Sequence, residues 1–243
     1  MKLLIGVCVY NEEKKIEGVL KKLIKLREKD GFDIVIGNDG STDKTNVICD
    51  KYVKKYKIKQ IKHKKNMGVG ANIRDLINYA RKNNYEVFTT ISGNGKINPK
   101  DMKKMYDLVL SGKYDYVKGS RYVKGGGCDN LPLFRKIAIP LFSFFVSILM
   151  HKKITDAPCL VNALNLKIFD NKNIDINQKW LEKYELEYYI LYNVLKYNYK
   201  FIEVPLHAKY PSNKKEKYTK IKPFSGWWSM IRPWILLKFK IKS

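Results

Sequence analysis

Short apolar runs rich in branched residues alternate with segments of helical periodicity over the first half of the chain. Five runs have the length and composition of β-strands, at Leu3–Val9, Ile34–Gly37, Ile58–Lys62, Val87–Ile91 and Tyr116–Gly119. The segments between them repeat apolar residues at helical spacing, most clearly at Ile16, Val19, Leu20, Leu23 and Ile24 and at Ile73, Leu76, Ile77 and Ala80, and more loosely at Val47, Val53 and Tyr56. This alternation predicts an α/β fold with a mostly parallel central sheet and helices on both faces.

The loops that follow four of these strands are rich in glycine and polar residues. They read VCVYNEE (Val7–Glu13), GNDGSTDKT (Gly37–Thr45), NMGVGANIR (Asn66–Arg74) and FTTISGNGKINPKD (Phe88–Asp101), with no repeat or low-complexity linker between them. In open parallel sheets the ligand lies beyond the carboxyl ends of the strands. We therefore expect these loops to form the binding site.

Two later segments are more apolar than the rest of the chain. Ile137–Met150 is apolar nearly all round, but its fourteen residues fall short of the roughly twenty that span a bilayer, so it is expected to be a core helix or an interfacial one. The chain end interleaves Trp227, Trp228, Trp234 and Phe239 with Arg232, Lys238, Lys240 and Lys242. Aromatic rings and cations together are typical of a membrane-interfacial anchor. Packing of these tryptophans onto the protein's own core is the equally open alternative.

Length and charge suggest one domain with an appendage and an anionic partner. The chain has 243 residues, and 48 Lys and Arg against 23 Asp and Glu give a formal net charge of +25. We expect a main domain over residues 1–210 and a basic aromatic extension over residues 211–243. Such a charge attracts nucleic acid, anionic membranes or phosphate-bearing substrates, although a lysine-rich coding bias explains the scattered lysines equally well. No RNA-reading motif accompanies the charge, so no specific nucleic-acid partner is expected.

The cysteines and the amino terminus indicate a reducing compartment. Cys8, Cys49, Cys128 and Cys159 lie far apart and form neither a CxxC pair nor a His/Cys cluster, which argues against a zinc site or a disulfide framework. The apolar run in MKLLIGVCVYNEE is too short for a signal peptide and lacks a small-residue cleavage site, so it is expected to be the first strand.

Several polar residues in these loops are candidates for nucleotide binding. Tyr10 offers an aromatic face for a nucleobase, and Glu12 a carboxylate for base or ribose hydroxyls. Asp39 stands at a strand end before a glycine turn, where its side chain would point into the same cleft. Ser41, Thr42 and Asp43 fit N-caps of the next helix, and this is the preferred interpretation for Asp43.

Taken together, VCVYNEE, NDGSTDKT and NMGVGANIRDLI resemble, in order and spacing, the nucleotide-binding half of inverting family 2 glycosyltransferases of the GT-A fold. The resemblance continues in KGSRYVKGGG (Lys118–Gly127), Arg135, TDAPCLVNALNLKIF (Thr155–Phe169) and FIEVPLHAKY (Phe201–Tyr210). It covers most of the chain. Within the family, the sequence is most similar to dolichyl-phosphate mannose synthase and the bacterial polyprenyl-phosphate sugar transferases.

This resemblance implies roles for particular residues. It implies that Tyr10 and Glu12 flank the base, that Asp39 contacts base or ribose, and that Arg121 and Arg135 lie near donor or acceptor phosphates, which suit the paired donors of a guanidinium. The nucleotide-binding positions that it implies are Val9, Tyr10, Asn11, Glu12, Asp39, Gly40, Gly68, Ser92, Gly93, Asn94 and Lys96.

The loop after the fourth strand departs from the family pattern. Where the family usually carries Asp-x-Asp to hold Mg²⁺ or Mn²⁺ on the donor diphosphate, this chain has Ser92-Gly93-Asn94. Neutral oxygen ligands stabilise a divalent cation less than carboxylates do, so Asn94 is only a weak metal candidate and metal dependence stays open. Lys96 offers a substitute charge for the leaving diphosphate. The loop is similar to the Gly-Asn-Lys loop of some family 2 members, which favours a variant site over a lost one.

A second departure concerns the acceptor. Lipid-phosphate transferases usually carry an arginine and a Ser-Lys pair where this chain has HAKYPSNKKEKYTKIKP, which offers His207, Lys209, Lys217 and Lys220. Lys220 is the expected phosphate contact. A phosphate acceptor needs no strong base, whereas a sugar hydroxyl needs one, for which the candidates are Asp156, Glu185 and Glu187. A purely structural role as a buried acid is an equally open alternative for Asp156.

The sequence thus predicts single-step transfer of a sugar, with inversion, from a UDP- or GDP-linked donor to a polyprenyl phosphate or another membrane-associated acceptor. Asp156, Arg121, Arg135 and Lys220 are the expected catalytic residues. We expect peripheral attachment to the cytoplasmic, inner face of an anionic membrane. Two alternatives remain: a transferase that extends a surface or lipid-linked glycan through hydroxyl attack, and a non-catalytic nucleotide-sugar-fold partner, because the Asp-x-Asp is absent.

Overall fold

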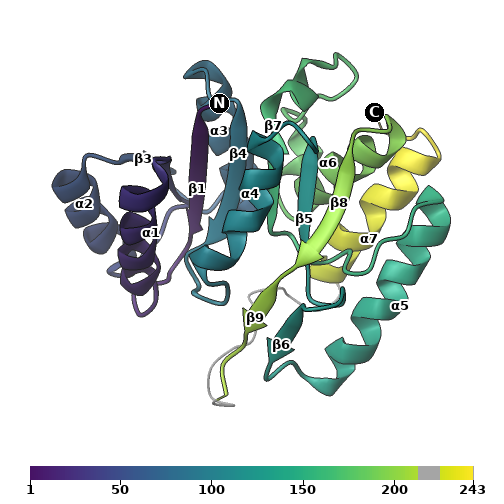
Figure 1. Cartoon of the computed structure of the whole chain (residues 1–243), viewed down its shortest axis with the longest axis horizontal. Coiled ribbons are helices and arrows are strands. Elements are labelled where there is room, and N and C mark those ends of the chain that lie inside the picture. Colours follow the sequence, from purple (N-terminus) through teal and green to yellow (C-terminus); the bar gives the residue numbers. More distant parts are fainter. Residues whose placement is uncertain (213–224, 243) are drawn as a thin grey trace.

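A seven-stranded sheet forms the centre of the computed structural model, which describes residues 1–212 and 225–242 (Figure 1). The strand order is β3-β2-β1-β4-β7-β5-β8. Every pairing is parallel except those of β7, which runs antiparallel to both of its neighbours. The strands are β1 (Leu3–Val9), β2 (Asp33–Asn38), β3 (Lys59–Lys62), β4 (Val87–Ser92), β5 (Tyr116–Ser120), β7 (Asn162–Asn165) and β8 (Phe201–Pro205). The five strands that the sequence predicts are confirmed, each within one residue at either end.

A smaller sheet lies beyond the carboxyl ends of the main strands (Figure 1). It pairs β6 (Gly127–Asp129) with β9 (His207–Lys209) in parallel. An isolated bridge between Ile97 and Ala208 connects β9 to the loop after β4. This small sheet brings the end of β9 next to the loop that replaces the Asp-x-Asp.

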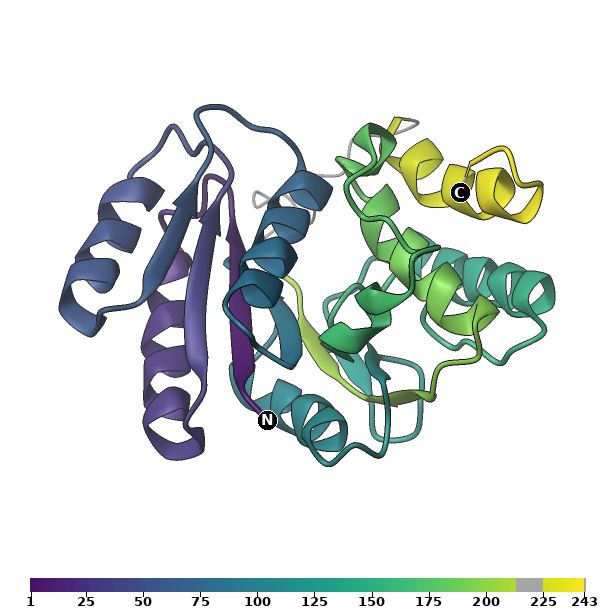
Figure 2. The same ribbon diagram turned by 90° about the horizontal axis from the view of Figure 1, so that it is seen from above.

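Helices cover both faces of the main sheet, as the alternating pattern predicts (Figure 2). They are α1 (Ile16–Asp30), α2 (Thr45–Tyr56), α3 (Val69–Lys82), α4 (Lys103–Leu110), α5 (Leu133–Met150), α6 (Glu185–Lys196) and α7 (Ser225–Lys238), with short 3₁₀ turns at Pro99–Met102, Leu166–Asp170 and Lys179–Leu181. Alternate β1 residues face opposite sides: Leu4 and Cys8 meet α3 and α6, whereas Ile5 and Val7 meet α1 and α4. The sheet therefore separates two hydrophobic cores.

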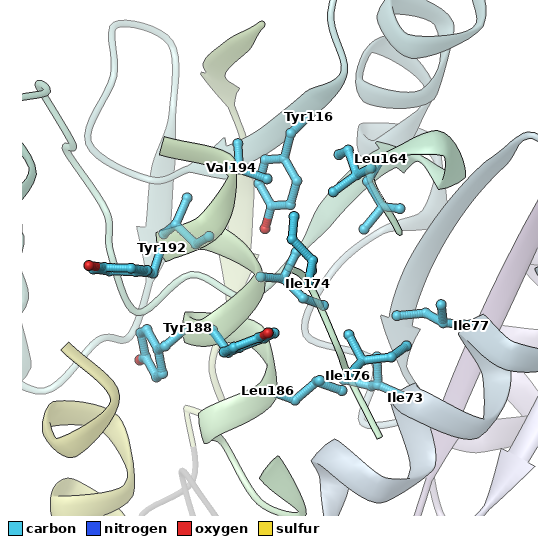
Figure 3. Close-up of a cluster of buried hydrophobic side chains, with 14 of the residues drawn as sticks. Ile73, Ile77, Tyr116, Leu164, Ile174, Ile176, Leu186, Tyr188, Tyr192 and Val194 are labelled. Atoms are coloured by element: carbon cyan, nitrogen blue, oxygen red, sulfur yellow. The ribbon is translucent and has the colours of Figure 1, made fainter. Parts of the chain in front are cut away.

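The core between α3 and α6 is the larger of the two. In Figure 3, Ile73 and Ile77 of α3 lie across from Leu186 and Tyr188 of α6, with the Ile174–Ile176 segment between the two helices. The predicted apolar positions of α1 and α3 are all buried. The looser expectation for α2 holds in part: Val53 and Tyr56 are partly buried against the core, but Val47 is 69% exposed, and Cys49 and Tyr52 are the buried apolar residues.

Helix α5 is longer than the pattern suggests. It has eighteen residues and begins at Leu133, because Arg135 and Lys136 interrupt the apolar run without ending the helix. The expected length of fourteen was therefore wrong. By length and composition, α5 is the one helix in the described ranges that could cross a membrane, and only 17% of it is buried. Ile139, Ser143 and Val146 form its buried side.

The C-terminal helix α7 packs against α6. Trp234 is fully buried and contacts the rings of Tyr188 and Tyr192, whose hydroxyl donates a hydrogen bond to the carbonyl oxygen of Leu237 at 3.1 Å. Trp227 and Trp228 are instead 44% and 55% exposed. The tryptophans of this segment thus divide between the protein's own core and its surface.

Candidate nucleotide and acceptor sites

The loops after β1 and β2 are joined by hydrogen bonds that involve their backbones. The backbone nitrogen of Asn11, at φ +50°, donates to the hydroxyl of Ser41 at 3.0 Å, and Asn11 Oδ1 accepts from the backbone nitrogen of Thr42 at 2.8 Å. Glu12 N donates to Thr45 Oγ1 at 2.7 Å. Ser41 and Thr42 therefore join the two loops, and Val9, Tyr10, Asn11 and Glu12 lie beside the Asp39 turn.

Asp43 lies one residue before Lys44, the N-cap residue of α2, but its side chain still bonds to the start of the helix, close to its predicted role. Its Oδ1 accepts from the backbone nitrogen of Thr45, the first residue of α2, at 2.9 Å. Its Oδ2 accepts from the backbone nitrogen of Glu13 at 3.2 Å. Asp43 thus satisfies a free donor at the start of the helix and also holds the β1 loop.

Asp39 is buried at the meeting point of three segments. Its Oδ1 faces Nδ1 of His63 at 2.7 Å and accepts from Met67 N at 2.8 Å, while its Oδ2 accepts from Gly68 N at 3.0 Å. A carboxylate oxygen accepts two hydrogen bonds, so Oδ2 keeps one position for a ligand hydroxyl or N–H. Asp39 therefore orders the loop before α3.

His63 was not identified by the sequence analysis. Its other ring nitrogen, Nε2, lies 3.0 Å from Oδ2 of Asp75 on α3, so the imidazole bridges two carboxylates and is only 10% exposed. The only indication of His63 in the sequence is that a histidine stands among lysines in IKHKK, at the end of β3. Because a lysine-rich segment is usually exposed to solvent, this histidine was not expected to be buried.

Two glycines are required where these loops approach other segments. Gly40 has φ +68°, and a Cβ there would lie 2.4 Å from the backbone carbon of Lys65. Gly68 has φ +104°, and a Cβ there would lie 2.3 Å from the carbonyl oxygen of Glu182. Both the positive φ and the close approach exclude a side chain.

The Ser92–Lys96 loop uses its polar groups to hold its own shape. Asn94 Oδ1 accepts from the backbone nitrogen of Lys96 at 3.1 Å, and Asn94 N lies 3.4 Å from Ser92 Oγ. Gly93 packs on β1, where a Cβ would lie 2.6 Å from Val9 Cγ1. The described part of the chain contains no group of three His, Cys, Asp or Glu residues placed to hold a metal ion. The residues of this loop therefore do not fit a Mg²⁺ or Mn²⁺ held by protein carboxylates.

Cations gather beside this loop. A cavity of about 360 Å³ is lined by lysines from three segments, Lys15, Lys22, Lys96 and Lys209, together with Asn94 and Tyr210. The ammonium of Lys96 lies 5.2 Å from the centre of the Tyr210 ring. The backbone nitrogen of Lys209 donates to the carbonyl oxygen of Lys96 at 2.8 Å. Positive charge thus surrounds the position where the family keeps its acidic pair.

Arg121 and Asp156 form a buried ion pair at the end of β5. Arg121 Nε and Nη2 donate to the two oxygens of Asp156, each at 2.7 Å, and the backbone nitrogen of Arg121 adds a third bond at 2.9 Å. Their side chains are 6% and 0% exposed. Burial acts to lower the pKa of Arg121, but its hydrogen bonds to Asp156 and the charge of Asp156 outweigh burial and raise it. The remaining nitrogen, Nη1, donates to the hydroxyl of Tyr210 at 2.5 Å.

Residues from β5 and β8 hold the Thr155–Asp156 segment. Glu203 accepts from Thr155 N and Thr155 Oγ1, each at 2.7 Å, and from Asp156 N at 3.2 Å. Ser120 Oγ lies 2.6 Å from Thr155 Oγ1, and the fully buried Lys118 donates from Nζ to the carbonyl oxygen of Asp156. None of these three supporting residues was assigned a role from the sequence.

The other acidic candidates are also engaged or buried. Glu185 is 1% exposed, and one of its oxygens lies 2.7 Å from Nη2 of Arg232 on α7. Burial raises the pKa of Glu187 to about 8, although the charge of Lys118 acts in the opposite direction. Glu187 therefore holds a proton at neutral pH. None of the three acids proposed as a base is an exposed, free carboxylate.

The remaining predicted residues fall into three groups. Arg135, in the first turn of α5, lies close enough to Tyr210 for its charge to lower the tyrosine's pKa, and its guanidinium has no ion pair with a described residue. His207 is exposed and pairs with Asp129 at 3.0 Å. Lys217 and Lys220 lie outside the described residues.

Two relatives of this chain carry names of glycosyltransferases that act on dolichol phosphate. The chain is 27% identical to the dolichol-phosphate mannosyltransferase of Pyrococcus furiosus over 56% of this chain, and it spans 38% of that protein. It is 27% identical to the UDP-N-acetylglucosamine–dolichyl-phosphate N-acetylglucosaminyltransferase of Methanococcus voltae, over 65% of this chain and 67% of that protein. An uncharacterized protein of Methanocaldococcus jannaschii is 28% identical over 86% and 82% of the two chains.

Solved structures establish the fold. Mannosyl-3-phosphoglycerate synthase from Rubrobacter xylanophilus superposes with a TM-score of 0.71 at 14% identity, covering 100% of this chain and 76% of that one. Glucosyl-3-phosphoglycerate synthase from Mycobacterium tuberculosis, solved with Mn²⁺, UDP and glucosyl-3-phosphoglycerate, gives 0.66 at 14% identity over 100% and 81% of the chains. The GT-A fold that the sequence predicts is therefore confirmed. The model of glycosyl transferase family 2 matches residues 4–171, and the chain belongs to this family of enzymes.

Proposed function

We propose that this glycosyltransferase moves a sugar, with inversion, from a UDP- or GDP-linked donor to a polyprenyl phosphate at a membrane surface. One observation carries the choice of acceptor: all three carboxylates that a hydroxyl acceptor would need as a base are unsuited to that role. Asp156 accepts three hydrogen bonds from Arg121, Glu185 is paired with Arg232, and Glu187 is buried in its protonated form. A phosphate monoester is ionised near neutrality and needs no base.

The donor would be bound by the loops after β1, β2 and β4. The free acceptor position on Oδ2 of Asp39 suits a ribose hydroxyl or a base N–H. Lys96 would face the diphosphate and stabilise the charge that develops as it leaves. This role replaces a metal held by carboxylates, which the Ser92–Lys96 loop does not supply.

The acceptor phosphate would approach from the Arg121 side. Arg135, which has no ion pair with a described residue, supplies a guanidinium for the phosphate oxygens. In a single displacement, an acceptor oxygen bonds to the anomeric carbon while the bond to the nucleoside diphosphate breaks and its electrons leave with the diphosphate. No proton moves, so positioning and charge stabilisation suffice. Arg121 and Asp156 would keep the site rigid, and Lys220 is a further phosphate contact in this proposal.

The apolar surface of α5 fits an acceptor that is embedded in lipid. Leu133, Ile137, Leu141, Phe144 and Ile148 are all more than half exposed. Phe134 lies 6.1 Å, centre to centre, from Trp227 of α7, so the two helices share one surface. We place this surface in the cytoplasmic leaflet of an anionic membrane, with its flanking lysines at headgroup depth.

Transfer assays test the choice of acceptor. Labelled UDP- and GDP-sugars are incubated with polyprenyl phosphate, with the matching polyprenol, and with lipid-linked glycans, each in Mn²⁺ and in EDTA. The proposal expects product on polyprenyl phosphate but not on polyprenol, with nucleotide binding retained in EDTA. Product on a glycan hydroxyl that is abolished by Asp156→Asn, Glu185→Gln or Glu187→Gln would establish the hydroxyl-attacking alternative. Nucleotide binding without turnover on any acceptor would favour the non-catalytic partner.

Vesicle sedimentation tests the membrane surface. The double change Phe144→Ser and Ile148→Ser is expected to reduce binding to vesicles that contain anionic lipid by about tenfold or more, because two large apolar side chains leave the membrane. Val47→Ser is the matched control, since Val47 is similarly exposed and belongs to α2, a helix at the opposite end of the sheet from α5 in Figure 1. Equal losses for both variants would contradict the placement.

A further inference from the structure

Tyr210 stands between the two groups of cations in the proposed site. It follows β9, at the point where the small sheet meets the loop after β4. Its backbone is held on both sides: Tyr210 N donates to the carbonyl oxygen of Asp129 at 3.1 Å, and its carbonyl oxygen accepts from Asn130 Nδ2 at 3.2 Å. The ring therefore projects from a fixed position.

The two ends of this side chain contact different cations. The ring lies 5.2 Å from the ammonium of Lys96, which is within the range of a cation–π interaction. The hydroxyl oxygen accepts a 2.5 Å hydrogen bond from Nη1 of Arg121, the one guanidinium nitrogen that does not bond to Asp156. Lys96 belongs to the donor side of the proposed site, and Arg121 belongs to its acceptor side.

We propose that Tyr210 is a positioning residue that sets the spacing between the donor cation Lys96 and the buried Arg121–Asp156 pair on the acceptor side. This inference rests on the proposed function. Displacement requires the attacking oxygen and the leaving diphosphate on opposite sides of one carbon, so Lys96 and the Arg121–Asp156 pair that keeps the acceptor side rigid must hold a fixed separation. A rigid aromatic ring with one polar end holds both cations with a single side chain.

The phenol remains a neutral hydrogen-bonding group. Burial raises the pKa of Tyr210, and the charges of Arg121 and Arg135 lower it by less. Because its oxygen accepts from Arg121, its proton stays available to an oxygen of a bound phosphate. The hydroxyl therefore belongs to the acceptor side of the site, and the ring belongs to the donor side.

Two substitutions separate these contacts. Tyr210→Phe keeps the ring but removes the hydroxyl, so KM for the polyprenyl phosphate is expected to rise about tenfold while the Kd for UDP or GDP changes less than twofold. Tyr210→Leu removes both, so it is expected to weaken nucleotide binding in addition, by about 2–5-fold. Tyr85→Phe is the matched control, because Tyr85 donates to Asp33 at 2.9 Å, at the opposite end of the sheet.

A double-mutant cycle tests whether the ring acts through Lys96. If it does, Tyr210→Leu costs nucleotide affinity in the wild-type chain but adds little to Lys96→Ala. Additive losses of nucleotide affinity would contradict the proposal that the Tyr210 ring acts through Lys96, which we call the donor arm. Equal rises of acceptor KM and nucleotide Kd in Tyr210→Phe would overturn the division of roles, because a merely structural defect affects both.

The nucleotide titrations need no acceptor. If no variant or wild-type protein transfers sugar to polyprenyl phosphate, the proposed function fails, while the cycle with Lys96 still decides the donor arm. If wild-type transfer occurs and Tyr210→Phe matches it in KM, the inference about Tyr210 fails and the proposed function stands.

Discussion

The donor and acceptor sides of this molecule are built from different interactions. On the donor side, the loops after β1 and β2 are joined by hydrogen bonds from backbone groups to the small side chains of Asn11, Ser41 and Thr45. On the acceptor side, Arg121 and Asp156 form a fully buried ion pair. A neutral bond at a partly exposed loop is replaced by water at small cost, whereas an unpaired buried charge is not. The two sides should therefore respond very differently to single substitutions.

The largest effect is expected from Asp156→Asn. It leaves the Arg121 guanidinium buried without a counter-charge, which costs about 3–5 kcal/mol of unfolding free energy. Chemical denaturation measures the difference. The control is Asp129→Asn, which breaks the exposed pair with His207 and should cost less than about 1 kcal/mol. Similar losses for the two variants would refute the claim that burial determines the contribution of these ion pairs.

The difference between the two sides also explains which parts of the molecule could be predicted from the sequence. The five strands and the donor loops were predictable because their contacts join short motifs with a plain alternation of apolar and polar residues. The Asp39–His63 contact crosses 24 residues, and the Arg121–Tyr210 contact crosses 89, so no local pattern revealed His63 or Tyr210. Lys118 and Glu203 read as ordinary charged strand residues. Only the packing of β5, β7 and β8 makes them supports of Asp156.

Helix α5 illustrates another limit of the pattern. The charges of Arg135 and Lys136 ended the apparent apolar run, yet both residues continue the helix because neither breaks its backbone. The division of α7 between the buried Trp234 and the exposed Trp227 was left open by composition. Only the position of α6 resolves it.

The second prediction extends the comparison to pH. Folding raises the pKa of Glu187 from its ordinary 4.5 to about 8 through burial. As pH rises through this window, the carboxyl group ionises in the unfolded chain but keeps its proton in the folded one. Glu187 therefore lowers the free energy of unfolding by about 1.4 kcal/mol for each pH unit. Below pH 4.5 the contribution vanishes, and above pH 8 the loss is complete. Glu187→Gln, which does not titrate, should therefore gain stability relative to wild type between pH 5 and pH 8.

Thermal or chemical unfolding at pH 5, 7 and 9 measures this gain. Glu86→Gln is the control, because Glu86 lies on the surface beside the amino terminus. Parallel pH profiles for wild type and Glu187→Gln would show that Glu187 is ionised in the folded protein at neutral pH. The acceptor side would then contain one more buried charge than we describe.

The third prediction concerns His63, whose contact with the buried Asp39 is the donor-side counterpart of the buried Arg121–Asp156 pair. His63 is nearly buried between Asp39 and Asp75, each of which contacts a different ring nitrogen, whereas a glutamine amide carries both of its donors on one nitrogen and does not reproduce this spacing. His63→Gln should release the loop at Met67 and Gly68 and weaken UDP or GDP binding by about tenfold, which is the effect of losing one hydrogen bond to a charged group. Calorimetric titration measures it, with the exposed His151→Gln as the control. An unchanged Kd would mean that Asp39 holds its position through the two backbone donors alone.

The smallest effect is expected from a short but exposed ion pair. Lys62 Nζ lies 2.6 Å from an Asp50 oxygen, closer than Arg121 lies to Asp156, but both partners are almost half exposed. Water and salt screen this contact, so Lys62→Ala should change the free energy of unfolding by no more than about 0.5 kcal/mol, and less in high salt. A loss near that of Asp156→Asn would mean that distance matters more than burial. We instead expect Lys62→Ala to cost much less unfolding free energy than Asp156→Asn, because the Lys62–Asp50 pair is exposed to water and the Arg121–Asp156 pair is not.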